Sequence, residues 1–466
     1  MKGDAARIKW SRIAGQFGDR PCVSGRLCDR APRNGWLRMN EPRALVDHFF
    51  RHEFGRLVAV LTRSLGVRRL DFVEDVVQAA LVQALETWSR RGVPEDPAGW
   101  LYRTARNLAI DALRRERTHA QALPRLAEDA ERESPPLEAH FADEIGDEPL
   151  RLLFVCCHEA VPAESRVALA LRMLCGFSTA EIARALLTTD ANVQKRIERA
   201  RDRLRAARLT LDVVFDTPPA AQLRARLDAV LAVVYLLFSQ GCHVTHGDMP
   251  IRRDLCAEAR RLARMLAAQS VGDVPAVHAL LALMCFHGAR FDARVAQGGA
   301  IVLLEEQDRS AWNWSDVREG MAWFARAAAG DELTRYHVEA AVAWEHCRAP
   351  TFADTDWRRI AELCETLERI APSPLHSLNR TVAEAYLHGS QAGPKRLAAV
   401  LPENVPARYP GWHAVIGELH FRLGQHSAAE RAWREALRLT TARADREFLR
   451  RRLAVCRPDG GEPAAE

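Results

Sequence analysis

The chain has 466 residues, of which 48% are hydrophobic and 27% are charged, so it is neither disordered nor fibrous. This length exceeds one compact domain and accommodates two or three. The formal net charge of +5 is too small to indicate nucleic-acid binding by itself, so the positions of the charges matter more than their sum.

The cysteines and the apolar runs argue against two further classes of protein. Eleven scattered cysteines follow no secretory signal, which predicts free thiols in a reducing cytoplasm. Cys156, Cys157 and His158 lack a second pair at zinc-finger spacing, and structural zinc takes about four ligands, so we expect no metal there. The longest strongly apolar run, Ala229 to Phe238, has ten residues, whereas a membrane span needs about 20. It predicts a buried helix and no membrane.

The first 38 residues differ from the rest. They carry nine basic and three acidic residues and no apolar stripe of helical period. We expect a disordered tail or a start codon assigned too far upstream rather than a functional basic arm. Residues 39–117 then form a first block with a helical pattern.

Within this block, Asp71 and Glu74 resemble a capping box that opens a helix running to about Trp88. Its apolar stripe is formed by Val73, Val77, Ala80, Ala84 and Trp88. A second surface is left to Glu74, Asp75, Gln78 and Glu86. Such a surface is either a solvated face or a polar docking surface for a partner.

A loop at residues 89–96 leads into the next predicted helix, with Asp96 as its N-cap and Pro97 in its first turn. The residues expected to face inward are Leu101, Ala105, Leu108 and Ala112. Residues 100–119 have a net charge of +3 and begin with Trp100. An aromatic ring beside arginines suits single-stranded nucleic acid, because a base stacks while its phosphate is neutralised. A core position for Trp100 is equally open.

Residues 118–149 predict a solvated linker, since they contain four prolines, nine acidic residues and two basic ones. A second helical block follows at residues 150–210. In it, Ser178 and Glu181 form a capping box, a tight turn is expected around residues 187–189, and Asp190 can cap the next helix. The apolar stripe of that helix is Val193, Ile197, Ala200 and Leu204.

A short capped helix, a tight turn and a basic amphipathic helix together predict a helix-turn-helix. Residues 192–208 have a net charge of +5. The residues pointing away from the apolar stripe include Asn192, Gln194, Lys195, Arg196, Arg199 and Arg203. We expect them to reach base edges or phosphates in a major groove, with Arg203 and Arg205 on the backbone. The alternative is a basic surface helix that binds no nucleic acid.

Residues 215–458 read as helices separated by short turns, and no segment of the chain alternates with a period of two. The predicted fold class is therefore all-α. From His413 to Leu439, small residues recur where two helices would cross, as in a tetratricopeptide unit of about 34 residues, so we expect a tetratricopeptide-like domain. His243, His246 and Asp248 favour a polar loop over a metal site.

Taken together, the two blocks resemble a bacterial RNA polymerase sigma factor of the extracytoplasmic-function type (sigma-70 group IV). The region 2 motifs are DFVEDVVQAALVQALETW and DPAGWLYRTARNLAIDALRRER. The region 4 motif is VPAESRVALALRMLCGFSTAEIARALLTTDANVQKRIERARDRLR. The remainder resembles the subgroup with a tetratricopeptide-like extension, through stretches such as EEQDRSAWNWSDVREG and PSPLHSLNRTVAEA.

The resemblance implies a role for each set of residues. Core RNA polymerase would be bound by Asp75, Gln78 and Glu86. The −10 element of promoter DNA would be melted and read by Trp100, Arg103, Arg106, Asn107 and Arg114, with a flipped base in the 89–96 loop. The −35 element would be read by Asn192, Gln194, Lys195, Arg196, Arg199 and Arg203.

The leading hypothesis is thus a non-catalytic, cytoplasmic sigma factor without a cofactor, whose C-terminal extension regulates it through a protein or ligand. The alternative is a stand-alone helix-turn-helix regulator with a tetratricopeptide sensor, although such a regulator has no use for the helices at 71–116. An enzyme is disfavoured, because the chain has no Gly-rich phosphate loop, HExxH or GxSxG motif.

Overall fold

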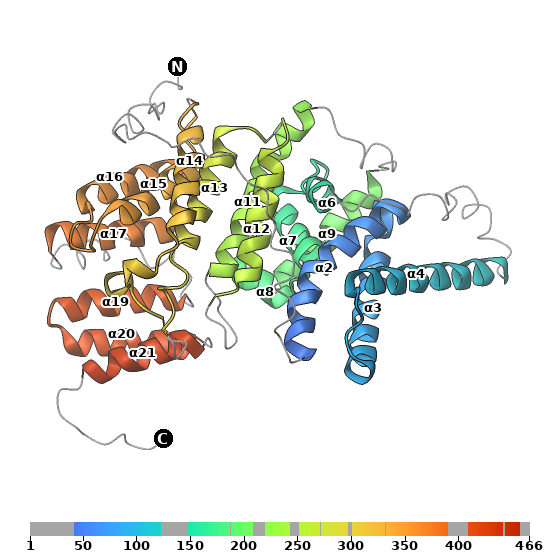
Figure 1. Ribbon diagram of the computed structural model, residues 1–466, viewed down its shortest axis with the longest axis horizontal. Helices are drawn as coiled ribbons and strands as arrows, with labels where there is room; N and C mark the ends of the chain where they lie inside the picture. Colours follow the sequence, from blue (N-terminus) through green and yellow to red (C-terminus); the bar gives the residue numbers. More distant parts are fainter. Residues whose placement is uncertain are drawn as a thin grey trace. The chain divides into compact units, whose positions relative to one another are not determined.

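The structure is a computed structural model (Figure 1). It describes residues 42–122, 148–186, 188–207, 220–242, 251–270, 272–296, 301–330, 332–389, 409–440 and 443–456. Within these ranges the elements are helices, and the only β-type pairing is an isolated bridge between Val295 and Ile301. The predicted all-α fold class is confirmed. The residues of the predicted 1–38 tail, most of the predicted acidic linker and His243, His246 and Asp248 lie outside the described residues, so these stay predictions.

The chain divides into two compact units, between Leu237 and Phe238. We call them the N-terminal unit and the C-terminal unit. The N-terminal unit contains α2 (Pro42–Leu65), η2 (Val67–Arg69), α3 (Leu70–Arg91), α4 (Pro97–Ala122), α6 (Glu148–Cys156), α7 (Ala163–Cys175), α8 (Thr179–Ala185) and α9 (Asp190–Ala206). The boundary falls inside α11 (Ala220–Cys242), so this helix contributes residues to both units.

Helix α3 forms because its apolar residues recur every three or four positions. The predicted stripe from Val73 to Trp88 is at most 2% exposed, which confirms it as the buried face. The helix runs three residues beyond the expected end and stops at Gly92, whose φ of +80° favours glycine. The predicted loop is therefore shorter, spanning residues 92–96.

The predicted cap of α3 is wrong. The helix begins at Leu70, directly after the short η2 turn, and no side chain caps it. Asp71 lies in the first turn, and both its carboxylate and that of Glu74 bind arginines from other helices. An acidic residue in the first turn still interacts favourably with the helix dipole.

Helix α4 begins as predicted, since the Gly99 N–H donates to Asp96 Oδ1 at 2.9 Å. Its buried face differs in part. Leu101, Ala105 and Ala109 are fully or almost fully buried, whereas Leu108 and Ala112 are only half-buried. The helix also continues to Ala122, into the segment predicted as linker.

Helix α2 packs on α3 and also on α6 and α7, so it joins the two helical blocks of the N-terminal unit. Gly55 makes this packing possible, because a Cβ there would lie 2.1 Å from the carbonyl oxygen of Leu174 in α7. Only a residue without a side chain lets two helix backbones approach this closely.

The C-terminal unit is a succession of packed helices (Figure 1). They are α12 (Arg253–Ala267), α13 (Pro275–Gly288), η3 (Leu304–Glu306), η4 (Arg309–Ala311), α14 (Trp314–Ala327), α15 (Arg335–Arg348), α16 (Trp357–Ile370), α17 (Pro374–His388), α19 (Pro410–Arg422), α20 (His426–Leu439) and α21 (Arg443–Val455). Helix α13 is buried on almost every side and packs against α12, α14 and α15. An all-round apolar helix is typical of a core position.

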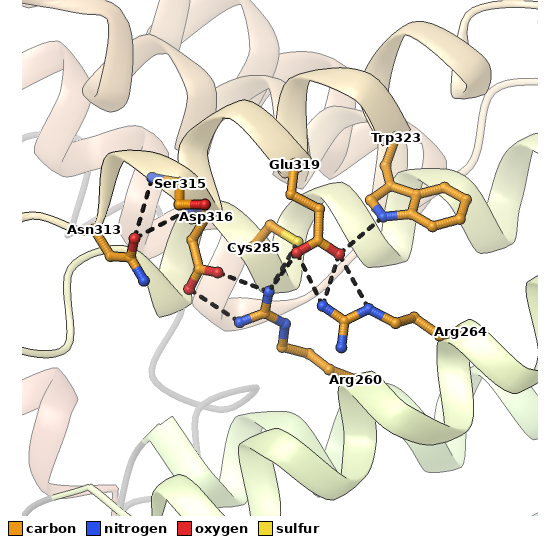
Figure 2. A network of polar contacts seen from close by, with 8 residues as sticks. All are labelled: Arg260, Arg264, Cys285, Asn313, Ser315, Asp316, Glu319 and Trp323. Carbon is orange, nitrogen blue, oxygen red and sulfur yellow. Dashed lines mark hydrogen bonds and ion pairs between the residues drawn. The ribbon is translucent and has the colours of Figure 1, made fainter. Parts of the chain in front are cut away.

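Helices α12 and α14 are joined by ion pairs (Figure 2). The Arg260 guanidinium binds both oxygens of Asp316 at 2.9 and 3.0 Å and also reaches Glu319 at 3.1 Å. Arg264 binds Glu319 as well, at 2.7 Å, and the Trp323 indole N–H donates to the same carboxylate at 3.2 Å. These contacts join the two helices through paired charges.

The predicted helix pair at the C-terminal end is present as α19 and α20, joined at Gly424 with a φ of +71°. A Cβ on Gly417 would lie 2.3 Å from the Trp433 ring, so the small residue is needed where the helices cross. Trp433 is fully buried and donates from Nε1 to the Ala414 carbonyl at 3.1 Å.

Helix α11 contains the apolar run noted in the sequence. By length and composition alone, its 19 residues Arg224–Cys242 are sufficient to cross a membrane. However, 56% of the residues in this stretch are buried inside the protein, and Val230, Leu231 and Leu237 are at most 1% exposed. The burial is that of a core helix.

Candidate nucleic-acid interface

Helices α8 and α9 build the predicted helix-turn-helix. The Ser178 N–H donates to Glu181 Oε2 at 2.9 Å and the Glu181 N–H donates to Ser178 Oγ at 3.2 Å, so the capping box is confirmed. The predicted Asp190 cap is wrong. Thr189 is the N-cap, because its hydroxyl accepts from the Asn192 N–H and its backbone is extended, while Asp190 is the first helical residue. Leu187, in the turn, lies outside the described residues.

The two faces of α9 separate as the sequence predicts. Val193, Ile197, Ala200 and Leu204 are at most 5% exposed. The exposed residues on the other faces include five of the six candidates for the −35 element: Asn192, Gln194, Lys195, Arg199 and Arg203. The sixth candidate, Arg196, is half-buried. The helix therefore presents a basic surface while its apolar stripe anchors it.

Several of these side chains are held by weak local contacts. Arg199 pairs with Glu164 of α7, Gln194 donates to Glu198 at 3.1 Å, and Asn192 donates to Thr188 at 2.8 Å. Exposed contacts of this kind contribute little to stability. Lys195 and Arg203 form no ion pair within the described ranges, which leaves their charges available.

Helix α4 carries the second candidate surface. Arg103, Asn107 and Arg114 are exposed, and Arg106 is half-buried. Trp100 is also half-buried and meets the buried Trp88 edge-to-face, with ring centroids 5.5 Å apart. One part of the Trp100 ring thus supports the end of α3 while the rest faces solvent. The sequence left the core and surface roles open, and the ring occupies an intermediate position.

The third candidate surface lies on α3. Asp75, Gln78 and Glu86 are exposed, and Val82 between them is 54% exposed. A single exposed apolar residue is ordinary on a protein surface, but surrounded by polar residues it matches the apolar centre and polar rim of a protein interface. Sequence reasoning missed Val82, although its spacing from Gln78 and Glu86 places it on the same face.

A cluster of charged residues joins α3 to the helix-turn-helix, and sequence reasoning did not identify it. Glu74 is 4% exposed and binds Arg172 of α7 and Arg201 of α9. Asp71 binds Arg201 at 2.7 Å and also Arg205. The expectation of an exposed Glu74 is therefore wrong, whereas Arg205 pairs with Asp71 of α3 while its side chain remains 45% exposed. Partners more than 90 positions apart leave no local signal in the sequence.

No group of three or more potential metal ligands lies together among the residues the structure describes. At the Cys156–His158 segment both thiols are fully buried. Burial raises the pKa of the Cys157 thiol to about 12, so it stays protonated at neutral pH. A metal ligand must be a thiolate, and this environment opposes one.

Three family models match the chain. Residues 49–119 match sigma-70 region 2, residues 151–204 match sigma-70 region 4, and residues 226–328 match a family of unknown function (DUF6596). An uncharacterised protein of Rhizobium meliloti (strain 1021) is 37% identical over 411 residues, which cover 85% of this chain and 94% of the relative. No solved structure gives a significant match.

The two sigma-70 models contain the three candidate surfaces. The region 2 match includes α3 and most of α4, and the region 4 match includes α8 and all but the last two residues of α9. The third model begins within α11 and continues through α14. The chain belongs to the same family as the Rhizobium meliloti protein, and it is a sigma factor of the sigma-70 type with a helical C-terminal domain.

Proposed function

We propose that this chain binds core RNA polymerase and directs promoter-specific initiation as an extracytoplasmic-function sigma factor. The observation that carries the proposal is the helix-turn-helix. Five of its six candidate base- or phosphate-reading residues are exposed on α9, opposite a buried stripe, and α8 is capped as predicted. No catalytic step is required of the chain.

At the −35 element, the N-terminal half of α9 enters the major groove. Lys195, Arg196 and Arg199 supply charge-assisted hydrogen bonds to base edges and phosphates, while Asn192 and Gln194 suit bidentate contacts to bases. Arg203, one turn further along, contacts the phosphate backbone.

At the −10 element, the exposed side of α4 contacts the separated strands. Arg103, Arg106, Asn107 and Arg114 neutralise phosphates or bind base edges, and the free part of the Trp100 ring offers a stacking surface. The loop at residues 92–96 holds an extruded base. Extrusion costs a few kcal/mol of unstacking energy, which contacts within such a pocket offset.

The exposed stripe of α3 binds core polymerase. Asp75, Gln78 and Glu86 provide polar contacts around Val82, which gives the surface an apolar centre. A factor that contacts both polymerase and DNA acts in the cytoplasm. The helical C-terminal domain, tetratricopeptide-like in its paired helices, regulates this activity through a protein or ligand.

Run-off transcription with purified core polymerase tests the proposal. We expect the full-length chain to direct initiation from its cognate promoters, and Arg199→Ala to weaken −35-dependent transcription by roughly 1–3 kcal/mol if Arg199 contacts a base. Arg431→Ala, which removes another exposed arginine, from α20, serves as the control. Specific duplex binding without any polymerase association would instead support a stand-alone regulator.

A further inference from the structure

Two arginines of the C-terminal unit have opposite surroundings. Arg260 is enclosed by the carboxylates of Asp316 and Glu319 (Figure 2). Arg290, two residues after the end of α13, has no carboxylate within ion-pair distance among the residues described, and it is partly buried. Among the residues described, it donates one hydrogen bond, from Nε to Gln307 Oε1 at 3.3 Å. The Gln307 amide is fixed in turn, since its Nε2 donates to the Val302 carbonyl at 3.1 Å.

A second arginine approaches the same place. The guanidinium carbons of Arg290 and Arg309 lie 5.6 and 4.6 Å from the centroid of the Trp312 ring, which is 3% exposed. Arg309 is anchored, because its Nη1 donates to the carbonyls of His346 and Ala349 at the end of α15, at 2.6 and 2.8 Å. Two guanidinium groups therefore both lie within cation–π distance of one indole ring.

Hydrogen-bond donors remain unused around this ring. Arg309 Nη2 and Trp312 Nε1 are both buried without a hydrogen-bond partner, and neither atom can accept a hydrogen bond. Buried donors without a partner also occur elsewhere in the structure, for instance at Arg260 Nε, but here two of them lie on side chains that also meet a second guanidinium group. Here two unused donors belong to side chains beside two guanidinium groups, and donors and positive charge together are the chemistry that binds an anion.

The electrostatics agree with this geometry. Burial and the charges of Arg294 and Arg309 lower the pKa of Arg290 to about 10. Burial also disfavours the charged form of Arg260, but its hydrogen bonds and ion pairs with Asp316 and Glu319 outweigh burial and raise its pKa. Arg290 therefore carries a charge that the protein itself does not compensate.

We propose that Arg290, Arg309 and Trp312 form a binding site for the phosphoryl group of a small-molecule ligand. Guanidinium groups match the oxygens of phosphate in geometry and charge, and two of them balance a phosphate dianion. The indole N–H adds a third donor, and Gln307 holds Arg290 in place. The site lies in the C-terminal unit, outside the surfaces assigned to polymerase and DNA.

Calorimetric titration of the full-length protein with inorganic phosphate, in chloride at constant ionic strength, tests the site. We expect saturable binding that Arg290→Met and Trp312→Phe each weaken at least tenfold. Trp312→Phe keeps an aromatic ring but removes the unused donor together with part of the indole. The matched control is Arg264→Met, because Arg264 belongs to the same unit and already has a carboxylate partner, so this variant should bind phosphate as the wild type does.

Thermal unfolding separates a binding role from a structural one. Without phosphate, Arg290→Met should unfold at or above the wild-type temperature, because it removes an uncompensated charge. Phosphate should raise the unfolding temperature of the wild type and leave that of Arg290→Met unchanged. The proposal is overturned if phosphate gives no effect beyond chloride, if neither variant weakens its binding, or if Arg290→Met is equally destabilised with and without phosphate.

Discussion

Single side chains in this protein take their properties from burial as much as from their chemical type. His337 is fully buried, and its Nδ1 accepts from the Thr334 N–H at 3.2 Å, which completes the capping box of α15. Burial lowers the pKa of His337 to about 4. The neutral ring is therefore part of the helix start, and a proton on Nδ1 would remove the acceptor.

His337 makes stability depend on pH in a defined direction. Its pKa is about 6.5 when unfolded and about 4 when folded, so the unfolded chain binds more protons between these values. The contribution of the neutral His337 to the free energy of unfolding is fully present above pH 6.5. It is lost as the pH falls toward 4, and the loss is about 2 kcal/mol at pH 5.

The variant His337→Gln isolates this contribution. Glutamine can accept the same capping hydrogen bond but does not titrate. Thermal unfolding at pH 7 and pH 5 should show a smaller acid-induced loss for the variant than for the wild type. Equal losses in the two proteins would exclude His337 as the source of the pH dependence.

At the scale of elements, the positions of small residues decide which helices approach closely. Gly417 lies in the middle of α19, where glycine lowers helix propensity. Its presence is explained by the Trp433 ring of α20, which occupies the space a Cβ would need. Close packing between these helices therefore outweighs the intrinsic preference of one of them.

Gly417→Ala should accordingly destabilise the C-terminal unit by about 1–3 kcal/mol through overpacking. On helix propensity alone the same change would stabilise it by about 1 kcal/mol, so the sign of the effect is decisive. Chemical denaturation of the variant and the wild type measures this change in the free energy of unfolding. Trp433→Leu in the same chain should reduce the penalty of the alanine, and additive effects of the two changes would argue against the contact.

The exposed face of helix α3 leads to a second prediction at this scale. Asp75→Ala and Val82→Ala should each weaken core-polymerase binding by about 1–2 kcal/mol, as expected for central interface residues. Both side chains are exposed, so the unfolding temperature should stay constant. Val455→Ala removes a similarly exposed valine from α21 and is the control in the pull-down or titration. Unchanged polymerase binding in both α3 variants would remove this face from the interface.

In the whole molecule, regions 2 and 4 are joined by charges as well as by apolar packing. Glu74, buried in α3, binds Arg172 and Arg201 of the region 4 helices, and Asp71 binds Arg201 and Arg205. These contacts engage one side of α9 and leave Lys195 and Arg203 on its surface exposed. The N-terminal unit is therefore one packed body that still presents its candidate DNA face.

Glu74→Gln should destabilise the N-terminal unit by about 1–3 kcal/mol, because two partly buried arginines lose their carboxylate. The neighbouring exposed Asp75→Asn should leave the unfolding temperature unchanged. Thermal unfolding of the two variants makes the comparison. If both behaved like the wild type, the cluster would contribute no more than an ordinary surface ion pair.

Much of the fold follows from local patterns in the sequence. A helical stripe depends only on residues three or four positions apart, so the buried faces of α3 and α9 could be predicted. The Ser178 capping box and the Asp96 cap are equally local. For the same reason, five of the six candidate −35 residues were correctly expected on exposed faces.

Tertiary structure alone decided the features that depend on distant partners. Asp71 and Glu74 read as a helix cap, yet they bind arginines about 100 to 130 positions away. The uncompensated charge of Arg290 is likewise invisible until the chain from α13 to α15 has packed around Trp312. Periodicity and capping are set by neighbours in sequence, whereas ion pairing and burial of a charge are set by neighbours in space.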